Sequence, residues 1–438
     1  MMNIRIYAAL GAALLSGLTA RAQQPLPLSL AECRERALAH SEELQQADNR
    51  LEQARLDRRI AVTAALPKIE GSATGAYVLP DMDMMGMDLR MRGTYMAGLN
   101  LTQPIYAGGK ISAARRMSRI GEEVAGEQQR MIRMDVLVEA DNAYWTTVAV
   151  DRQVRMLESY AAQMDTLYRQ TEAAFKAGMA IENDLMRIEA KRSEIRYQLQ
   201  KAQNGAELCR MSLCRVIGAE RDQHPVPTDT LFQTSEPGAL LSDLASRPEL
   251  RILEQQVAVG EQQIRDVRSA MLPSVGLSLG YTYYGNIKLQ SVVDAGNGTF
   301  IPHTQEFRDG IGLAMLAVKI PIFHWGESRK KVRKARYELQ HAQLDLQKNT
   351  RLMSLEVEQA IRNVEDGYRL IQTAGLALQQ AEENLRVMRN RYKAQMAPLT
   401  DLLDAQSQWQ QAASNRIEAQ TQYRIYETEY RRSTGTLE

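Results

Sequence analysis

The chain has 438 residues, 44% of them hydrophobic, so it can bury a substantial core and is long enough for two or three domains. Its 54 basic and 53 acidic residues leave a net charge of +1, which gives no electrostatic basis for binding nucleic acid. The five histidines are scattered and stand in no metalloprotease, phosphate-loop or nucleophile motif, so the sequence predicts no enzyme, no cofactor and no metal site.

The first 22 residues have the pattern of a secretory signal peptide. A mostly apolar run from Ile6 to Leu18 is followed by the small-x-small sequence Ala20-Arg21-Ala22, which predicts cleavage before Gln23. An uncleaved anchor helix is the alternative, but the run is short for a bilayer and no stop-transfer pattern follows it. We therefore expect an exported chain whose signal peptide spans residues 1–22.

The three cysteines suggest neither a redox motif nor a metal site. Cys33, Cys209 and Cys214 form no CxxC pair, and the last two are five residues apart, which places them on different faces of a helix. A disulfide between Cys209 and Cys214 is the less favoured alternative to free thiols. Beyond the signal region no run of 18 apolar residues occurs, so an exported chain of this kind is either soluble or builds its membrane part from strands.

The chain contains an internal duplication. The segment FKAGMAIENDLMRIEAKR, residues 175–192, aligns without a gap to YKAQMAPLTDLLDAQSQW, residues 392–409, at an offset of 217. Earlier in the chain, ALPKIEG is echoed by MLPSVGL at an offset of 206, so the second copy carries a loop 11 residues longer. A period of this length indicates a duplicated domain rather than a solenoid. We expect a first repeat over 23–225 and a second over 226–438.

Proline placement predicts long helices in both repeats. No proline lies between Ile105 and His224 or between Ile322 and Ala397, although one interior proline would cost a helix about 3 kcal/mol. Apolar residues there recur at alternating steps of three and four, which is the 3.5-residue period of a left-handed coiled coil. Each repeat should therefore contain a long helical hairpin, with its tip at about 176–182 in the first and about 393–399 in the second.

A period of two replaces this pattern around each Leu-Pro. Apolar residues alternate there with small polar ones over stretches of about ten residues, the length of a tilted strand that crosses a bilayer. The predicted β-hairpins cover about 68–103 and about 274–320. Their strands are Lys68–Leu79, Gly93–Thr102, Ser274–Tyr284 and Gly310–Ile320.

Four strands are too few to close a barrel, and an unpaired strand edge in lipid leaves unsatisfied backbone groups. The chain must therefore oligomerise if it is to span a membrane. Strand counting alone allows a dimer with eight strands or a trimer with twelve.

This order of elements resembles the TolC-like outer-membrane efflux family, the outer membrane factors of tripartite efflux or type I secretion systems. The order is signal peptide, helix, Leu-Pro, β-hairpin, proline-aromatic-x-Gly (QPIYAGGK and IPIFHWGE), long helical hairpin, and then all of it again. The resemblance implies a mainly α fold with a small β part. Long antiparallel coiled-coil helices would form a periplasmic α-barrel, and two β-hairpins would contribute four strands to a trimeric 12-stranded outer-membrane β-barrel.

The resemblance also implies a function and partners. The chain would be the outer-membrane exit duct of a Gram-negative efflux or secretion pump, with a large periplasmic part, and would conduct substrates passively. Its partners would be two further copies in a homotrimer, a periplasmic adaptor (membrane fusion) protein, an inner-membrane pump of the RND or ABC type, and outer-membrane lipid. A soluble periplasmic coiled-coil adaptor or scaffold protein is the alternative, but it would not need two hairpins of bilayer length.

The resemblance assigns a periplasmic gate to the second helical turn. Asp401 and Asp404 match the family's pair of constriction aspartates, Asp184 matches the acidic position of the first copy, and Tyr392 matches a gate tyrosine. Rings of carboxylates would concentrate cations and repel anions. The alternative is that these aspartates only balance a helix dipole. At the position of Ala397, one member of the family carries a basic residue that helps to latch the gate.

The absence of that basic residue leaves the latch to other groups, for which Lys176 and Lys393 are candidates. The two tips are expected to dock the adaptor. The docking residues are Lys176, Ala177, Gly178, Met179, Lys393, Ala394, Gln395 and Met396.

One further segment is unusual. The loop Pro80–Gly93 holds five methionines, and clustered thioethers can bind Cu(I). Because the loop is a hairpin tip that a substrate would pass last, an apolar lid or packing between subunits is the favoured interpretation.

Overall fold

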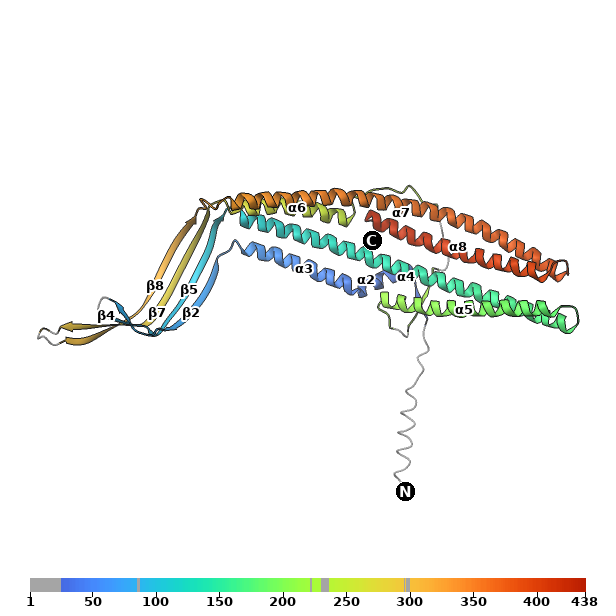
Figure 1. The fold of residues 1–438 in the computed structure, drawn as a ribbon, viewed down its shortest axis with the longest axis horizontal. Coiled ribbons are helices and arrows are strands. Elements are labelled where there is room, and N and C mark those ends of the chain that lie inside the picture. The colour runs from blue at the N-terminus through green and yellow to red at the C-terminus, as the bar shows by residue number, and fades with distance from the viewer. Residues whose placement is uncertain (1–24, 85–86, 221–222, 230–235, 295, 297–299) are drawn as a thin grey trace, which may run out of the picture. The chain divides into compact units, whose positions relative to one another are not determined.

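The computed structural model describes residues 25–84, 87–220, 223–229, 236–294, 296 and 300–438, so the predicted signal peptide lies outside the described residues. The chain divides into two compact units. The first comprises the residues up to Asp48 together with Gln128–Leu250 and Asn349–Glu438, and the second comprises Asn49–Glu127 and Arg251–Lys348. Most described residues are helical, and the strands form a small β part, as expected for this fold class (Figure 1).

The helices of the described part begin and end as follows. They are α2 (Leu30–His40), α3 (Glu42–Thr63), α4 (Lys110–Lys176), α5 (Glu182–Val216), α6 (Pro248–Ser269), α7 (Glu327–Lys393) and α8 (Leu399–Thr434).

Two of these helices, α4 and α7, each run for 67 residues without a break. They correspond to the two proline-free stretches of the sequence. Gly121 and Gly126 do not interrupt α4, and a Cβ added at either would meet no atom within 4 Å. Each glycine costs a helix only about 1 kcal/mol, and the alanine, arginine, glutamate and methionine around them are strong helix formers.

In the first unit the helices pack as two antiparallel hairpins, α4 with α5 and α7 with α8 (Figure 1). Tyr160, Met164 and Ile188 of the first hairpin share a buried cluster with Leu385 and Leu402 of the second. The two copies of the repeat therefore bury their apolar stripes against each other, which is the packing that the 3.5-residue period predicts.

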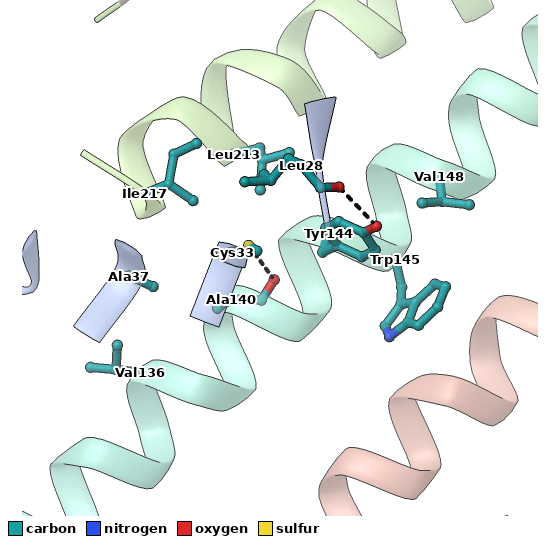
Figure 2. Close-up of a cluster of buried hydrophobic side chains, with 10 residues drawn as sticks. All are labelled: Leu28, Cys33, Ala37, Val136, Ala140, Tyr144, Trp145, Val148, Leu213 and Ile217. Atoms are coloured by element: carbon teal, nitrogen blue, oxygen red, sulfur yellow. Dashed lines mark hydrogen bonds between the residues drawn. The ribbon is translucent and has the colours of Figure 1, made fainter. Parts of the chain in front are cut away.

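A second cluster of the first unit surrounds the start of the described chain. Sequence patterns did not predict β1 (Pro25–Leu28), which pairs in parallel with β6 (His224–Pro227). Figure 2 shows that the Tyr144 hydroxyl, from α4, donates to the Leu28 carbonyl at 3.1 Å, while the Cys33 thiol faces the Ala140 carbonyl at 3.9 Å. All three cysteines are free thiols, so the disulfide alternative is wrong.

Burial in this cluster raises the pKa of Cys33 to about 12. Between the ordinary thiol pKa of about 9 and that value, the unfolded chain releases the Cys33 proton and the folded chain keeps it. The free energy of unfolding should therefore fall as pH rises above about 9. Urea unfolding at pH 8 and pH 10, compared with Cys33→Ala, measures this difference. An equal pH dependence in both proteins would contradict it.

A buried ion pair ties three helices of the first unit together. The Arg34 guanidinium, on α2, donates two hydrogen bonds to the Asp141 carboxylate on α4, at 2.7 and 2.6 Å. The Thr428 hydroxyl, on α8, donates to the same carboxylate at 2.6 Å. The Asp141 side chain is fully buried, so these donors replace the water that an ionised carboxylate requires.

In the second unit the long strands form one antiparallel sheet in the order β2, β5, β7, β8 (Figure 1). The strands are β2 (Lys68–Tyr77), β5 (Arg92–Ala107), β7 (Ser274–Asp294) and β8 (Phe300–Lys319), with the short β3 (Met82–Met84) and β4 (Met87–Arg90) beside the outer part of β7. Within the described residues β2 pairs only with β5 and β8 only with β7, so both long edges of the sheet are open.

Three strands are longer than the ten residues expected: β5 has 16, β7 has 21 and β8 has 20. In β7 and β8 the ladder continues past an irregularity between Tyr284 and Ile287, where Asn286 takes a positive φ of 59°. Its side-chain amide donates to the carbonyls of Arg92 and Gly93 at 2.9 and 3.0 Å. The strict alternation stops at this bulge, but the ladder of β7 with β8 continues beyond it.

The register gives the sheet two chemically different faces. One face carries cross-strand rows of apolar side chains, of which Ile69, Leu101 and Leu279 form one. The opposite face is mostly small and polar on β2, β5 and β7, where the Ser278 hydroxyl donates to the Asn100 side chain at 3.0 Å. On β8 the same face carries Ile311, Leu313 and Met315. Many of the apolar side chains are exposed, because no described helix covers this face.

None of the described helices contains an apolar stretch long enough to cross a membrane.

Candidate functional site

The tips of the two helical hairpins are built in the same way. At the end of α4 the Met179 amide donates to the Ala174 carbonyl at 2.8 Å, and the Gly178 amide to Phe175 at 2.9 Å. Gly178 has a left-handed φ of 75°. These bonds form a Schellman motif, which satisfies the last carbonyls of the helix and ends it. The sequence resemblance of the two tips therefore reflects one shared backbone conformation.

The second tip makes the same turn with a less suitable residue. The Met396 amide donates to the Arg391 carbonyl at 2.8 Å, and Gln395 occupies the left-handed position at a φ of 59°. A side chain with a Cβ is disfavoured there by about 1 kcal/mol relative to glycine.

Exchanging these two residues should change stability in opposite directions. Gln395→Gly should raise the free energy of unfolding by about 1 kcal/mol, and Gly178→Gln should lower it by a similar amount. The midpoint of the helical signal in urea measures both. Ala394→Gly, one residue before the left-handed position, should give no gain. A loss of stability in Gln395→Gly would contradict the conformational argument.

The predicted docking residues are at these turns, and all eight are exposed. Met179 and Met396 occupy equivalent positions, each directly after the left-handed residue. Both thioether side chains are more than two-thirds exposed. Flexible methionines of this kind adapt well to a partner surface.

The predicted gate carboxylates lie just beyond the second turn. Asp401 stands in the first turn of α8 and Asp404 one turn later, so the two share a helix face. Both side chains are exposed, and neither makes an ion pair with a described residue. Asp184 occupies the equivalent place in the first turn of α5 and is half-buried. Three uncompensated carboxylates therefore lie near the tips, with Asp401 and Asp404 on one face.

The structure connects α4 to α7 close to these carboxylates. The hydroxyls of Tyr392 and Thr171 lie 3.5 Å apart, and the Arg389 guanidinium donates to the Gln163 side chain at 2.7 Å. The sequence did not indicate Arg389, Gln163 or Thr171. The only sequence feature that could have indicated them is their position in or next to the apolar stripe of the coiled coil.

The two lysines considered as latch residues do not link the two hairpins. Lys176 pairs with Glu172 of its own helix at 3.0 Å, and among the described residues Lys393 has no ion-pair partner. Neither lysine therefore joins α4 to α7, and the side chains of Arg389 and Tyr392 take that place.

A cavity of about 450 Å³ opens beside this connection. It is lined by one face of α4, by Arg389 and Tyr392 of α7, and by Leu402 and Gln406 of α8. Only 3% of Gln406 is exposed, and its Oε1 has no hydrogen-bond partner among the described residues. The packing of the helices near the tips is therefore incomplete, in contrast to the satisfied ion pair at Asp141.

This fold, with long helical hairpins and a small sheet, is shared by solved outer-membrane channels. The family model for outer membrane efflux proteins matches residues 33–217 and 240–436. The chain therefore belongs to the outer membrane efflux protein family. The predicted family, the efflux function and the outer-membrane location in a Gram-negative bacterium are confirmed.

Individual relatives are distant in sequence but similar in structure. The chain is 21% identical to the outer membrane protein TolC of Vibrio cholerae over 86% of this chain and 83% of that protein. It is 22% identical to the cation efflux system protein CusC of Escherichia coli K12, over 77% of this chain and 69% of the relative. The crystal structure of VceC, an outer membrane protein of Vibrio cholerae, superposes with a TM-score of 0.76 at 18% identity, covering 93% of this chain and 96% of that one.

Proposed function

We propose that this chain is the passive exit duct of a tripartite efflux or secretion pump. The observation that carries the proposal is the sheet of the second unit, which has one exposed apolar face, an opposite face that is mostly small and polar on β2, β5 and β7, and two open edges. In water such a sheet would expose apolar surface and unpaired backbone groups. In a membrane, lipid would cover the apolar face and the polar face would line a channel.

The open edges argue for assembly. Edge strands β2 and β8 would pair with their counterparts in neighbouring copies, and three copies would supply twelve long strands. A homotrimer satisfies every edge, and it would bring six helical tips around one opening. The chain itself supplies no catalytic motif, so transport energy has to come from a partner.

The gate proposal rests on Asp401 and Asp404. In a trimer these exposed carboxylates would form a ring of six at the inner mouth, where they would favour cations over anions. Asp184 and Tyr392 belong to the same region. The contacts of Arg389 with Gln163 and of Tyr392 with Thr171 would hold the mouth closed in place of the basic residue that Ala397 replaces.

The tips are the proposed docking surface for a periplasmic adaptor, which would connect the duct to an inner-membrane pump of the RND or ABC type. Met179→Glu combined with Met396→Glu should abolish co-purification of the adaptor and pump with this chain from native membranes. The double variant should still fractionate with the outer membrane, because neither residue is in the sheet. Gln200→Glu combined with Gln380→Glu, which adds the same charge at exposed positions on α5 and α7 away from the turns, is the matched control. Unchanged recovery of both partners with the double variant would overturn the docking assignment.

A direct test of the duct is its conductance. Purified protein inserted into a planar bilayer should carry ions without any energy source, and Asp404→Asn should alter the ion preference. Inserted protein that carries no current, even after the contacts of Arg389 and Tyr392 are removed, would contradict the proposed function.

A further inference from the structure

The segment that follows β8 exposes apolar side chains next to the sheet. Ile322 and Trp325 are 91% and 86% exposed, and Phe323 is exposed as well. The rings of Phe323 and Trp325 contact each other edge to face, with centroids 5.0 Å apart. Trp325 holds a positive φ of 50°, at the position that Gly108 occupies in the first repeat. A bulky residue in this conformation is strained, so the tryptophan is retained at a cost to the backbone.

The first turns of α7, directly after this segment, are strongly basic. The buried side of these turns is formed by Val332 and Ala335. Two of the basic side chains pair with acidic residues of their own helix, at Glu327 and Glu338, and among the described residues the other four make no ion pair. The six exposed basic residues are Arg329, Lys330, Lys331, Arg333, Lys334 and Arg336.

The positive charge of these six residues is unfavourable at the start of a helix. The N-terminus of a helix carries a partial positive charge, so cations near it are unfavourable, and six like charges in three turns also repel one another. Four of these six charges have no ion-pair partner among the described residues, and uncompensated like charges at this end of a helix indicate an external ligand. The ligand that would offset both effects is an anion.

A cavity of about 340 Å³ lies between the apolar and basic parts of this region. Its lining includes Met271 from the turn after α6, Ile322 and Phe323 from the exposed segment, and Arg329 from α7. It therefore joins an apolar wall to a cationic group, as an amphiphilic ligand requires.

We propose that residues 320–336, here called the junction surface, bind an anionic glycerophospholipid of the periplasmic leaflet. The proposal rests on the proposed membrane sheet. Val318 lies on the apolar face near the end of β8, and the exposed apolar residues Ile320 and Ile322 follow it in sequence. The aromatic rings would therefore lie at the headgroup level, where tryptophan is favoured. Arg329 and the following basic residues would then face the phosphates. Clusters of four to eight basic residues next to a membrane segment are typical of anionic-lipid binding.

An acidic protein partner is the main competing occupant. It would satisfy the basic residues but would leave unexplained why an exposed aromatic pair continues the lipid-facing surface of the sheet. A lipid would explain both the exposed aromatic side chains and the basic residues of the junction surface.

Fluorescence quenching by brominated lipid tests this contact. The chain has three tryptophans, of which Trp145 and Trp409 belong to the helices of the first unit, so Trp325→Phe supplies the background signal. The full chain is placed in vesicles of phosphatidylcholine and phosphatidylglycerol, with bromine on the upper acyl carbons of one lipid or of the other. Flotation of the vesicles first shows whether the chain inserts.

We expect the Trp325 signal to be quenched, and more strongly by brominated phosphatidylglycerol than by brominated phosphatidylcholine. Replacing Arg329, Lys330, Arg333 and Arg336 with Gln should reduce that preference at least about tenfold, because four cationic groups that would contact the phosphates are removed. The same charge loss further along the helix, with Lys348, Arg362, Arg369 and Arg386 replaced by Gln, should leave it unchanged. Trp325→Gly should fold normally, because glycine relieves the positive φ.

Chains that fail to float would contradict the proposed membrane sheet itself. Chains that float but show no quenching of Trp325, or equal quenching by both lipids in the unmodified protein, would overturn the junction surface as an anionic-lipid site. A preference for quenching by brominated phosphatidylglycerol that persists after the four Gln substitutions would also overturn the assignment. Relief of quenching by added acidic peptide would assign the surface to a protein partner instead.

Discussion

Replacing Arg34 with Met should lower the free energy of unfolding by about 3–5 kcal/mol, the usual cost of leaving a buried charge without its partner. The Asp141 carboxylate is fully buried and, among the described residues, would keep the Thr428 hydroxyl as its one side-chain donor. The loss should be seen as a lower urea midpoint for the helical signal. Because α2, α4 and α8 meet at this carboxylate, the effect should extend to the whole first unit.

Two further variants make this result specific. Arg36→Met, on the exposed side of the same helix, should change stability by less than about 0.5 kcal/mol. Adding Asp141→Asn to Arg34→Met should recover a substantial part of the loss, because the uncompensated charge is then gone. A double variant less stable than Arg34→Met alone would show that the ion pair is not the cause.

The combined variant Asp401→Asn and Asp404→Asn should lower the cation preference of the open channel by a factor on the order of ten. The physical reason is that a ring of carboxylates raises the local concentration of cations and excludes anions. Reversal potentials across a planar bilayer under a salt gradient measure the preference. The effect should shrink at high ionic strength, because the screening length falls.

Asp404→Asn alone separates the gate from the helix-dipole alternative. Asp404 lies beyond the first turn of α8, so its removal should alter selectivity but not stability, whereas a purely structural role would predict neither effect there. Glu418→Gln, an exposed charge further along α8, is the control. Unchanged selectivity in the double variant would remove Asp401 and Asp404 from the gate.

The long helices were predictable because their signals are local. The absence of proline, the three-four spacing and the repeat of the tip sequence all act through neighbouring residues, and α4 and α7 begin and end close to the expected limits. The alternation in Ser274–Tyr284 was readable for the same reason. The alternation could not predict the part of β7 beyond Asn286, because the bulge there breaks the two-residue period although the hydrogen bonds to β8 continue.

The missed residues depend on contacts between distant parts of the chain. Arg34, Asp141 and Thr428 come from three helices, and nothing near any of them in sequence marks the other two. The same holds for Arg389 with Gln163. The basic run at the start of α7 is different, because its signal is present in the sequence as RKKVRK and acquires meaning only once it is found next to the exposed aromatic pair.

The proposed duct requires that the open edges of one chain's sheet pair with those of other copies in a membrane. The most direct measurement is the mass of the native assembly extracted from the outer membrane in mild detergent, corrected for bound detergent. The account predicts three copies of the chain. A dimer would require a different closed sheet, and a monomer recovered from the soluble periplasm would contradict the duct altogether.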